Sequence, residues 1–128
     1  MKHLAILVIL AGSSVAYSQT ERPEQVCFSM VLIRAPETDT PAQVNEARHK
    51  AEQVRNSAEQ GSSFSDLARA NSQGVAAAEG GVLGCFKRGT LSKQLEDRVF
   101  KMQAGEVSEV MHTKQGFVLF QVTEHKVP

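Results

Sequence analysis

The polar side chains that most resemble catalytic groups in this 128-residue chain lie close together near its C-terminal end. Ser108, Glu109 and His112 supply a hydroxyl, a carboxylate and an imidazole. A hydrolase needs a nucleophile, a base and an orienting acid in mutual contact. The surrounding residues predict a short strand without the sharp strand-to-helix turn of a nucleophile elbow. The pattern therefore does not favour a hydrolase.

Two cysteines, Cys27 and Cys85, allow two interpretations. In an exported chain they could form a disulfide, which would close a long loop and contribute about 4 kcal/mol in the chain-entropy model. Alternatively, each is a small buried hydrophobic residue on its own strand, because cysteine is among the most buried residue types. We favour separate thiols. We expect no metal and no cofactor, since His49, His112 and His125 show no ligand spacing with either cysteine.

The N-terminus has the order of features that a signal peptide requires. Lys2 and His3 precede an apolar run, Leu4 to Ala11, which is too short to span a bilayer and is followed by small residues. A buried N-terminal strand or helix is the alternative. We expect residues 1–18 to be a signal peptide, residues 19–25 a linker, and the mature protein to be exported, either periplasmic or secreted. The small residues directly after the apolar run, 12–18, include no cysteine that could carry a lipid, so we expect no membrane anchor after cleavage.

The charge of the expected mature chain excludes some partners. Removing residues 1–18 takes away one of the 14 basic residues, Lys2, and none of the 14 acidic residues, so the net charge is near −1. A near-neutral domain with interspersed charges offers no basic surface for nucleic acid or an anionic membrane. We expect neither partner, and the sequence indicates no oligomeric state.

The first half of the chain predicts a strand followed by two helices. The segment from Val26 to Ile33 is apolar except for Ser29, and this near-continuous run predicts a strand near the centre of a sheet. The segment Thr40-Pro41-Ala42-Gln43 has the pattern of a capping box with proline at the first helical position, and it predicts a long amphipathic helix that ends at Gly61. His49 falls on the polar face of this helix and is expected to be solvated. A shorter helix is predicted from Ser63.

The second half predicts three more strands and a helix after a pair of glycines. Gly80 and Gly81 are not followed by the Lys-Ser/Thr and helix of a phosphate loop, so we expect them to supply unusual backbone angles and a close approach to a neighbour. A strand follows them. A helix is predicted over Leu91–Met102, then strands over Val107–His112 and Phe117–Thr123. This order predicts an α+β domain with an antiparallel sheet.

Short motifs recur in order through this half of the chain. They are Phe64-x-x-Leu67-Ala68, Gly80-Gly81-Val82-Leu83-Gly84-Cys85-Phe86, Arg88-Gly89, Gly105-Glu106-Val107-Ser108 and Thr113-Lys114-Gln115-Gly116. In spacing and order they resemble the parvulin (PpiC, or rotamase) family of peptidyl-prolyl cis-trans isomerases. The resemblance covers Val26 to Glu124. It implies a parvulin or FKBP-like domain over residues 26–124, with a four-stranded antiparallel sheet wrapped by about four helices.

The resemblance also places an apolar proline pocket. It falls on Leu83, Leu91 and Leu95, with Phe86 beside it. Such a pocket, in surroundings of low polarity, binds the twisted amide of the transition state better than the planar ground state, and the reaction needs no covalent step. Alternatively, these residues belong simply to the hydrophobic core.

The polar part of the family's site is replaced in this chain. The two family histidines fall at Met30 and Val118. An apolar pair can replace a hydrogen-bonded pair at little cost in stability, so we expect a stable fold. Thr113 survives from the polar set, and Gln115 occupies a position that is Ser or Phe in many members. These two residues are the candidate catalytic positions.

Two further positions bear on the substrate. The family's Cys or Asp falls at Gln73 or Gly74, and neither residue supplies a thiolate or carboxylate. The loop from Arg34 to Asp39 holds one base and two acids, which disfavours recognition led by a phosphate group. We expect unmodified, unfolded or extended proline-containing polypeptides as ligands.

Two functions follow from the resemblance. One is an exported isomerase that assists the folding of envelope or secreted proteins. The alternative is a binding module of the same fold, a chaperone or assembly subunit with weak or no catalysis. The first accelerates cis-trans exchange of a prolyl peptide, whereas the second binds the peptide without accelerating exchange.

Overall fold

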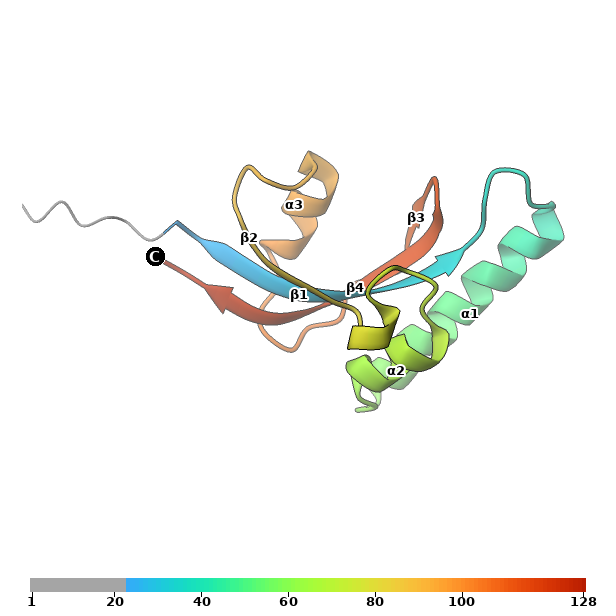
Figure 1. The fold of residues 1–128 in the computed structure, drawn as a ribbon, viewed down its shortest axis with the longest axis horizontal. Helices are drawn as coiled ribbons and strands as arrows, with labels where there is room; N and C mark the ends of the chain where they lie inside the picture. Colours follow the sequence, from blue (N-terminus) through green and yellow to red (C-terminus); the bar gives the residue numbers. More distant parts are fainter. Residues whose placement is uncertain (1–22) are drawn as a thin grey trace, which may run out of the picture.

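The computed structural model describes residues 23–128, which form a single sheet and the helices that cover it (Figure 1). In chain order the elements are β1 (Gln25–Arg34), α1 (Pro41–Glu59), α2 (Phe64–Asn71), the 3-10 helix η1 (Ala77–Glu79), β2 (Val82–Lys87), α3 (Lys93–Val99), β3 (Met111–Thr113) and β4 (Gly116–Lys126). The four strands form an antiparallel sheet in the order β2-β1-β4-β3. The α+β prediction is confirmed, with three α-helices and a 3-10 turn in the described chain in place of about four helices.

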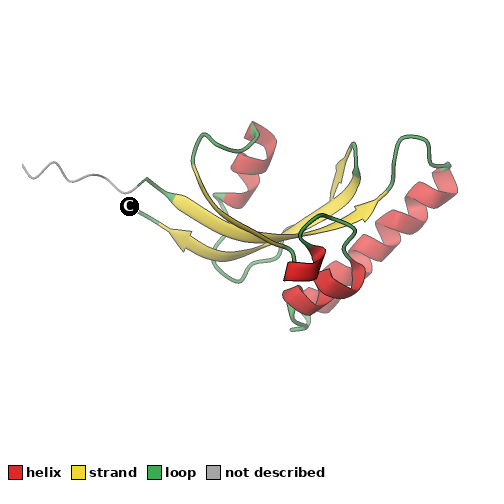
Figure 2. Cartoon of the chain, in the orientation of Figure 1, coloured by secondary structure: helices red, strands yellow, loops and turns green. Residues whose placement is uncertain are grey.

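Different helices cover the two faces of the sheet. Helices α1 and α2 pack on one face and α3 on the other (Figures 1 and 2). Successive side chains of a strand point to opposite faces, so neighbouring residues join different cores. Val31 and Leu119 belong to the core under α1 and α2, whereas Leu32 and Phe120 belong to the core under α3. The sheet therefore has apolar side chains on both sides.

Strand β1 lies between β2 and β4, which confirms the prediction of a central strand. It pairs with β4 from Gln25 to Arg34, and β4 runs past its predicted end at Thr123. All residues from Val26 to Ile33 are buried except Met30, which is half-buried. Burial on both faces explains why the strand is an apolar run without alternation.

The start of α1 follows from its first four residues. Gln43 N–H donates to the Thr40 hydroxyl at 3.2 Å, and Thr40 N–H donates to the Gln43 side-chain carbonyl at 2.8 Å, so the predicted capping box is confirmed. Helix α1 ends at Glu59, and Gly61 then adopts φ +104°. His49 is exposed, as predicted, and its ring lies 3.2 Å from the Gln53 side-chain nitrogen.

The helix predicted over Leu91–Met102 is shorter than expected. Helix α3 spans only Lys93–Val99. Ser92 has an extended backbone and occupies the N-cap position, so the helix begins after it. At the other end Met102 N–H donates to the Val99 carbonyl at 3.2 Å, an i to i−3 bond that closes the last turn more tightly than an α-helix.

The strand predicted over Val107–His112 is also displaced, because β3 spans Met111–Thr113. Ser108 explains the difference. Its N–H donates to the Phe120 carbonyl at 2.7 Å, and Phe120 N–H donates back to the Ser108 hydroxyl at 2.8 Å. The Ser108 hydroxyl thus takes the place of a backbone carbonyl as the acceptor for Phe120 N–H. Regular backbone pairing with β4 is interrupted at this residue.

Cys27 and Cys85 form a disulfide, so the expectation of separate thiols is wrong. The two residues are direct partners across β1 and β2. Opposed residues of an antiparallel pair have their β-carbons close enough for such a bond. The sequence left this undecided because the pairing register of strands whose cysteines are 58 residues apart is a tertiary property.

Glu24 joins the start of β1 to the ends of β2 and β4. Arg88 donates to its carboxylate at 2.9 Å, and His125 Nε2 lies 3.2 Å from the same oxygen. The hydrogen bond from Arg88, and then that from His125, hold the pKa of Glu24 below its ordinary value of 4.5. Because the folded-state pKa is lowered, this contact stabilises the fold at neutral pH, and the contribution is lost as the pH falls below 4.5 through the folded-state pKa.

The predicted signal peptide, residues 1–18, and most of the linker, residues 19–25, lie outside the described residues. Between residues 23 and 128, none of the helices combines the length and the apolar character that crossing a bilayer requires.

Candidate functional site

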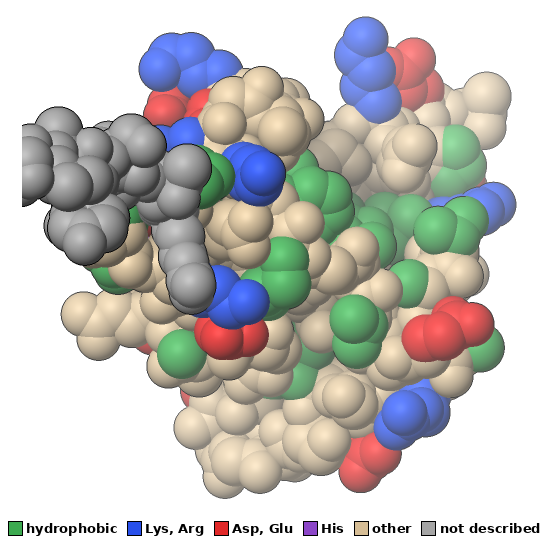
Figure 3. Space-filling model, turned by 60° about the vertical axis from the view of Figure 1, so that its left-hand side comes forward, with side chains coloured by type: hydrophobic (Ala, Val, Ile, Leu, Met, Phe, Trp, Pro, Cys, Tyr) green, Lys and Arg blue, Asp and Glu red, His purple; other side chains and the backbone are tan. Residues whose placement is uncertain are grey.

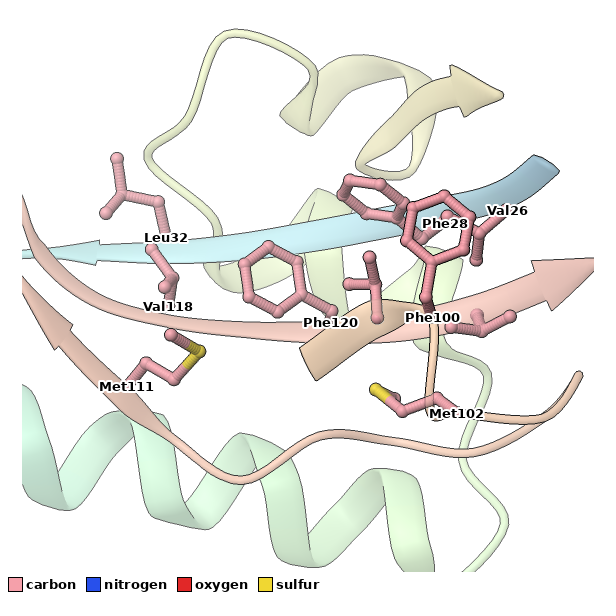
Figure 4. Close-up of a cluster of buried hydrophobic side chains, with 10 residues drawn as sticks. Val26, Phe28, Leu32, Phe100, Met102, Met111, Val118 and Phe120 are labelled. Atoms are coloured by element: carbon pink, nitrogen blue, oxygen red, sulfur yellow. The ribbon is translucent and has the colours of Figure 1, made fainter. Parts of the chain in front are cut away.

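Apolar side chains stand half-buried at the border of the core under α3. Leu83 and Phe86 come from β2, Leu95 comes from α3, and Leu91 precedes α3; all pack against the buried cluster of this face. We name these residues the apolar ledge. Figure 4 shows the cluster on which the ledge rests, with side chains of β1 and β4 converging with those that follow α3. The structure therefore brings together the residues predicted as the substrate-binding set.

Phe86 is held in the ledge by a series of aromatic contacts. The ring centroids of Phe86 and Phe28 are 5.2 Å apart, and those of Phe28 and Phe120 are 5.5 Å apart in an edge-to-face arrangement. Such pairs contribute about 0.5–1.5 kcal/mol beyond the burial of their surface. Phe28 and Phe120 are both buried, so the ledge has a rigid floor.

A β-bulge places Leu83 on the same face as Phe86. In a regular strand, residues three positions apart would point to opposite faces. Here Phe28 pairs with Gly84 while Ser29 pairs with Val82, so Leu83 has no partner on β1. Leu83 is the extra residue of this bulge, and the bulge changes the face of the sheet to which the following side chains point. Leu83 and Phe86 consequently both pack against the core under α3.

The close approach predicted for the double glycine is confirmed at Gly81. Met30 N–H donates to the Gly81 carbonyl at 2.9 Å, and a β-carbon on Gly81 would overlap the Met30 carbonyl oxygen. Gly81 also has φ +79°, a left-handed conformation that glycine adopts without steric cost. This contact fixes the chain that enters β2 against β1, directly beside Met30.

Met30 and Val118, which stand where the family has histidines, lie on adjacent strands and share a face. Val118 pairs directly with Leu32, and Met30 is the next residue of β1 on that face. Val118 also pairs with Met111 on β3. Within residues 23–128, no buried side-chain nitrogen or oxygen lacks a hydrogen-bond partner. The apolar pair therefore leaves no polar group stranded.

A groove of about 610 Å³ opens at Met30, which packs against the same buried cluster as the ledge. Sequence reasoning did not define this groove. Val75, at its edge, is 97% exposed. On the surface in Figure 3, hydrophobic side chains lie between projecting charged side chains. The lining residues of the groove are Met30, Leu32, Arg34, Pro36, Gln73, Gly74, Val75, Lys114 and Gln115.

Of the two candidate catalytic residues, Thr113 is the last residue of β3 and Gln115 lies in the turn that leads to β4. The Thr113 hydroxyl donates to the Gly116 carbonyl at 2.9 Å and accepts from Gln115 N–H at 3.3 Å, so this hydroxyl shapes the turn. The Gln115 side chain is exposed and lines the groove. Its backbone carbonyl accepts from Ala35 N–H at 3.1 Å, which holds the turn against the end of β1.

Ser72 and Gln73 complete the edge of β1 beyond the end of β2. Leu32 N–H donates to the Ser72 hydroxyl at 3.1 Å, and Arg34 N–H donates to the Gln73 side-chain carbonyl at 2.7 Å. Gln73 N–H also donates to the Leu32 carbonyl at 2.7 Å. Gln73, one of the two positions assigned to the family's Cys or Asp, thus has a side chain that accepts a hydrogen bond from the backbone of β1. Sequence reasoning missed this role because the partner is a distant backbone group.

The hydrolase hypothesis is not supported by the placement of its residues. Ser108 is buried, and its hydroxyl donates to the Glu109 carbonyl at 2.9 Å while accepting from Phe120 N–H. His112 is exposed and stacks on Phe117, with ring centroids 4.5 Å apart. The hydroxyl is occupied by backbone groups, so it is not paired with a base.

The fold and the ledge define a parvulin-type domain, and the comparisons with known proteins agree. The model of the PPIC-type PPIASE domain matches residues 15–126. The chain belongs to this family of peptidyl-prolyl cis-trans isomerase domains. The similarity extends over nearly the whole chain, and so covers both the ledge and the groove.

The chain has relatives that are named chaperone SurA. The chain is 38% identical over 106 residues to the chaperone SurA of Cupriavidus pinatubonensis, which covers 82% of the chain and 21% of that protein. It is 36% identical over 102 residues to SurA of Nitrosococcus oceani, which covers 80% of the chain and 24% of that protein. The chain thus spans about a fifth to a quarter of the length of these relatives.

Solved structures share the fold. A PpiC-type peptidyl-prolyl cis-trans isomerase domain superposes with a TM-score of 0.70 at 23% identity, covering 82% of this chain and 94% of that one. PrsA from Bacillus subtilis gives 0.62 at 28% identity, covering 78% of this chain and 35% of that one. SurA-like chaperones of Campylobacter jejuni, one described as periplasmic, give 0.62 at 21% identity, covering 83% of this chain and 40% of that one.

Proposed function

We propose that this chain is an exported peptidyl-prolyl cis-trans isomerase that acts on extended proline-containing segments of envelope or secreted proteins. The apolar ledge carries the proposal. Its side chains stay half-buried, while the cluster beneath them on the same face is closed. A half-buried apolar surface beside an open groove suits a small apolar ring on an extended chain. The SurA relatives, which are chaperones, support a polypeptide ligand.

The geometry favours catalysis by binding. Rotation about a prolyl bond has a barrier of about 18–20 kcal/mol, and each tenfold acceleration requires about 1.4 kcal/mol of preferential binding to the transition state. A proline ring held on Leu83, Leu91 and Leu95 would be fixed while the preceding amide twists in surroundings of low polarity. Among the candidate polar groups, the Gln115 side chain lines the groove and is free to approach a rotating carbonyl.

A second candidate function, binding without catalysis, is favoured by a different observation. Two of the three polar side chains at the family's site positions, those of Gln73 and Thr113, are engaged in the fold. The Gln73 side-chain carbonyl accepts from Arg34 N–H, and the Thr113 hydroxyl is used within its turn. With Met30 and Val118 apolar, fewer polar groups remain to stabilise a twisted amide. A domain of this kind would hold extended segments without exchanging their prolines.

Two-dimensional exchange NMR on Xaa-Pro peptides distinguishes these functions. We expect cis-trans exchange cross-peaks to appear on addition of the mature protein. Replacing Leu91 with lysine should reduce the exchange rate about tenfold or more, because removing a leucine from an apolar contact costs about 1.5–3 kcal/mol. The matched control is Val127→Lys, which changes an exposed apolar residue at the C-terminal end of the chain and should leave the rate unchanged.

The outcomes separate cleanly. Peptide signals that shift on binding without exchange would establish the binding module. Equal exchange rates in Leu91→Lys and the parent protein would show that the apolar ledge does not contribute to catalysis. The dispersion of the amide spectrum and the urea midpoint of each variant show whether it remains folded, so loss of the fold is not mistaken for loss of the site.

A further inference from the structure

We propose that the outer edge of β2 binds the backbone of an extended proline-containing segment as an added antiparallel strand. The inference rests on the proposed function and specifies how the ligand of the ledge is held. In the described part of the chain β2 pairs only with β1, so it is an edge strand. Edge strands present unpaired N–H and C=O groups to which extended peptides can bind. Leu83 and Phe86 belong to β2, so this edge is continuous with the apolar ledge.

The pairing of β2 with β1 determines which of its backbone groups point outward. The Glu24 carbonyl accepts from Arg88 N–H at 3.4 Å where the two segments meet. Hydrogen-bonded and non-hydrogen-bonded pairs alternate along an antiparallel ladder. Counting back along β2 from Arg88, Phe86 therefore directs its backbone groups toward β1. Cys85 and Lys87 direct theirs away from β1.

Three of these outward groups are available to a ligand. Within residues 23–128, no hydrogen bond from another residue reaches the N–H or carbonyl of Cys85, or the N–H of Lys87. The Lys87 carbonyl is occupied, because it accepts from the Thr90 N–H at 3.3 Å and from the Thr90 hydroxyl at 2.6 Å. Cys85 and Lys87 are exposed, and no heavy atom lies within 4 Å of a β-carbon built on Gly84. The edge thus offers two donors and one acceptor without a crowding neighbour.

The geometry of an antiparallel pair suits a proline at this edge. A ligand residue opposite Cys85 would exchange two hydrogen bonds with it, whereas a residue opposite Phe86 would direct its own nitrogen away from β2. Directly opposed residues point to the same face of a sheet, so the latter residue would lie on the ledge face. Proline has no N–H and is tolerated in a strand where its nitrogen faces outward. The position that places a proline ring on the ledge is therefore one where the missing N–H costs no hydrogen bond.

Such a pairing would hold the two sides of the prolyl bond unequally. With proline opposite Phe86, the residue after the proline lies opposite Cys85 and is held by two hydrogen bonds. The residue before the proline lies opposite Lys87, which offers only its N–H. The amide that precedes the proline is thus less restrained, and it can rotate while the ring stays on the ledge.

N-methylated peptides test this pairing. We would take one extended Xaa-Pro peptide and methylate the backbone nitrogen either of the residue directly after proline or of the next residue. The first N–H would donate to the Cys85 carbonyl, so its methylation removes a hydrogen bond and inserts a methyl group between the strands. The dissociation constant, measured by NMR titration, should rise about fivefold or more. The second N–H would point away from β2, so its methylation should change the dissociation constant by less than about twofold.

Amide hydrogen exchange provides an independent readout on the protein. In the presence of saturating peptide, the N–H groups of Cys85 and Lys87 should exchange about tenfold more slowly than in the free protein. The N–H of Phe86 lies between them and faces β1, so its exchange rate should stay the same. This amide is the internal control for a general change in the stability of the sheet.

A pair of variants at Lys87 removes one donor selectively. Lys87→Pro deletes an N–H that faces solvent, a position where an edge strand tolerates proline. It should bind the peptide about threefold more weakly than Lys87→Ala, which also lacks the lysine side chain but keeps the N–H. The urea midpoints of both variants show whether they remain folded.

The outcomes distinguish a failure of the inference from a failure of the proposed function. Equal effects of the two methylations, or unchanged exchange of the Cys85 and Lys87 amides in the complex, would overturn the added strand. Catalysed cis-trans exchange of the unmethylated peptide would preserve the isomerase in that case. Protection of these amides that grows with protein concentration in the absence of peptide would assign the edge to a second copy of the chain and overturn the inference. Failure of every prolyl peptide to bind or exchange would overturn both.

Discussion

Reduction of the Cys27–Cys85 disulfide is expected to lower the free energy of unfolding by about 4 kcal/mol. The bond joins residues separated by 58 positions, and opening it returns conformational freedom to the unfolded chain. It also attaches β2, an edge strand, to the central strand β1. Since β2 carries Leu83 and Phe86, the reduced protein should also bind prolyl peptides more weakly.

Urea unfolding followed by circular dichroism, with and without a reductant, measures this effect. The control is the double variant Cys27→Ala, Cys85→Ala, which should unfold at the midpoint of the reduced parent protein and should not respond to the reductant. A parent midpoint that stays the same after complete reduction of the bond would contradict the prediction. Titration of free thiols confirms that reduction has occurred.

The second large effect is expected at Gly81. Replacing it with alanine should cost about 3 kcal/mol or more, of which the left-handed backbone accounts for about 1–2 kcal/mol. The remainder comes from the new β-carbon, which would overlap the Met30 carbonyl oxygen and lie 3.1 Å from the Ala68 β-carbon. Both neighbours belong to regular elements, so the strain cannot be relieved by rotating a side chain.

The matched control for this prediction is Gly89→Ala. Gly89 has φ +89°, and no heavy atom lies within 4 Å of an added β-carbon. Its substitution should cost only the conformational term of about 1–2 kcal/mol. The difference between the two variants, measured by urea unfolding, isolates the close approach to Met30. Equal losses of stability would show that the approach is not tight.

Features set by neighbouring residues could be predicted from the sequence. The capping box of Thr40 and Gln43 needs only four consecutive residues, so the start of α1 was predictable. The central place of β1 followed from a run that is apolar except for Ser29, since such runs mark strands buried on both faces. The family motif placed the ledge residues in sequence, and their gathering on one face of the sheet agrees with that placement.

Features set by the register of distant segments could not be predicted. The disulfide depends on Cys27 standing opposite Cys85, which no local pattern determines. The bulge at Leu83 depends on the same pairing of β1 with β2. Gly84 is the local signal for it, because a glycine inside a strand often marks a bulge. The groove is lined by residues of β1, the segment after α2 and the turn after β3. The sequence alone therefore did not show that Arg34 and Lys114 line the same groove.

We propose that proline recognition takes place on the face of the sheet that α3 covers. Mapping of amide chemical shifts during titration with a prolyl peptide locates this binding surface. We expect the largest changes at Leu83, Phe86, Leu91 and Leu95, together with Met30, and negligible changes along α1. Changes centred on α1 and α2, or spread evenly over the protein, would contradict it.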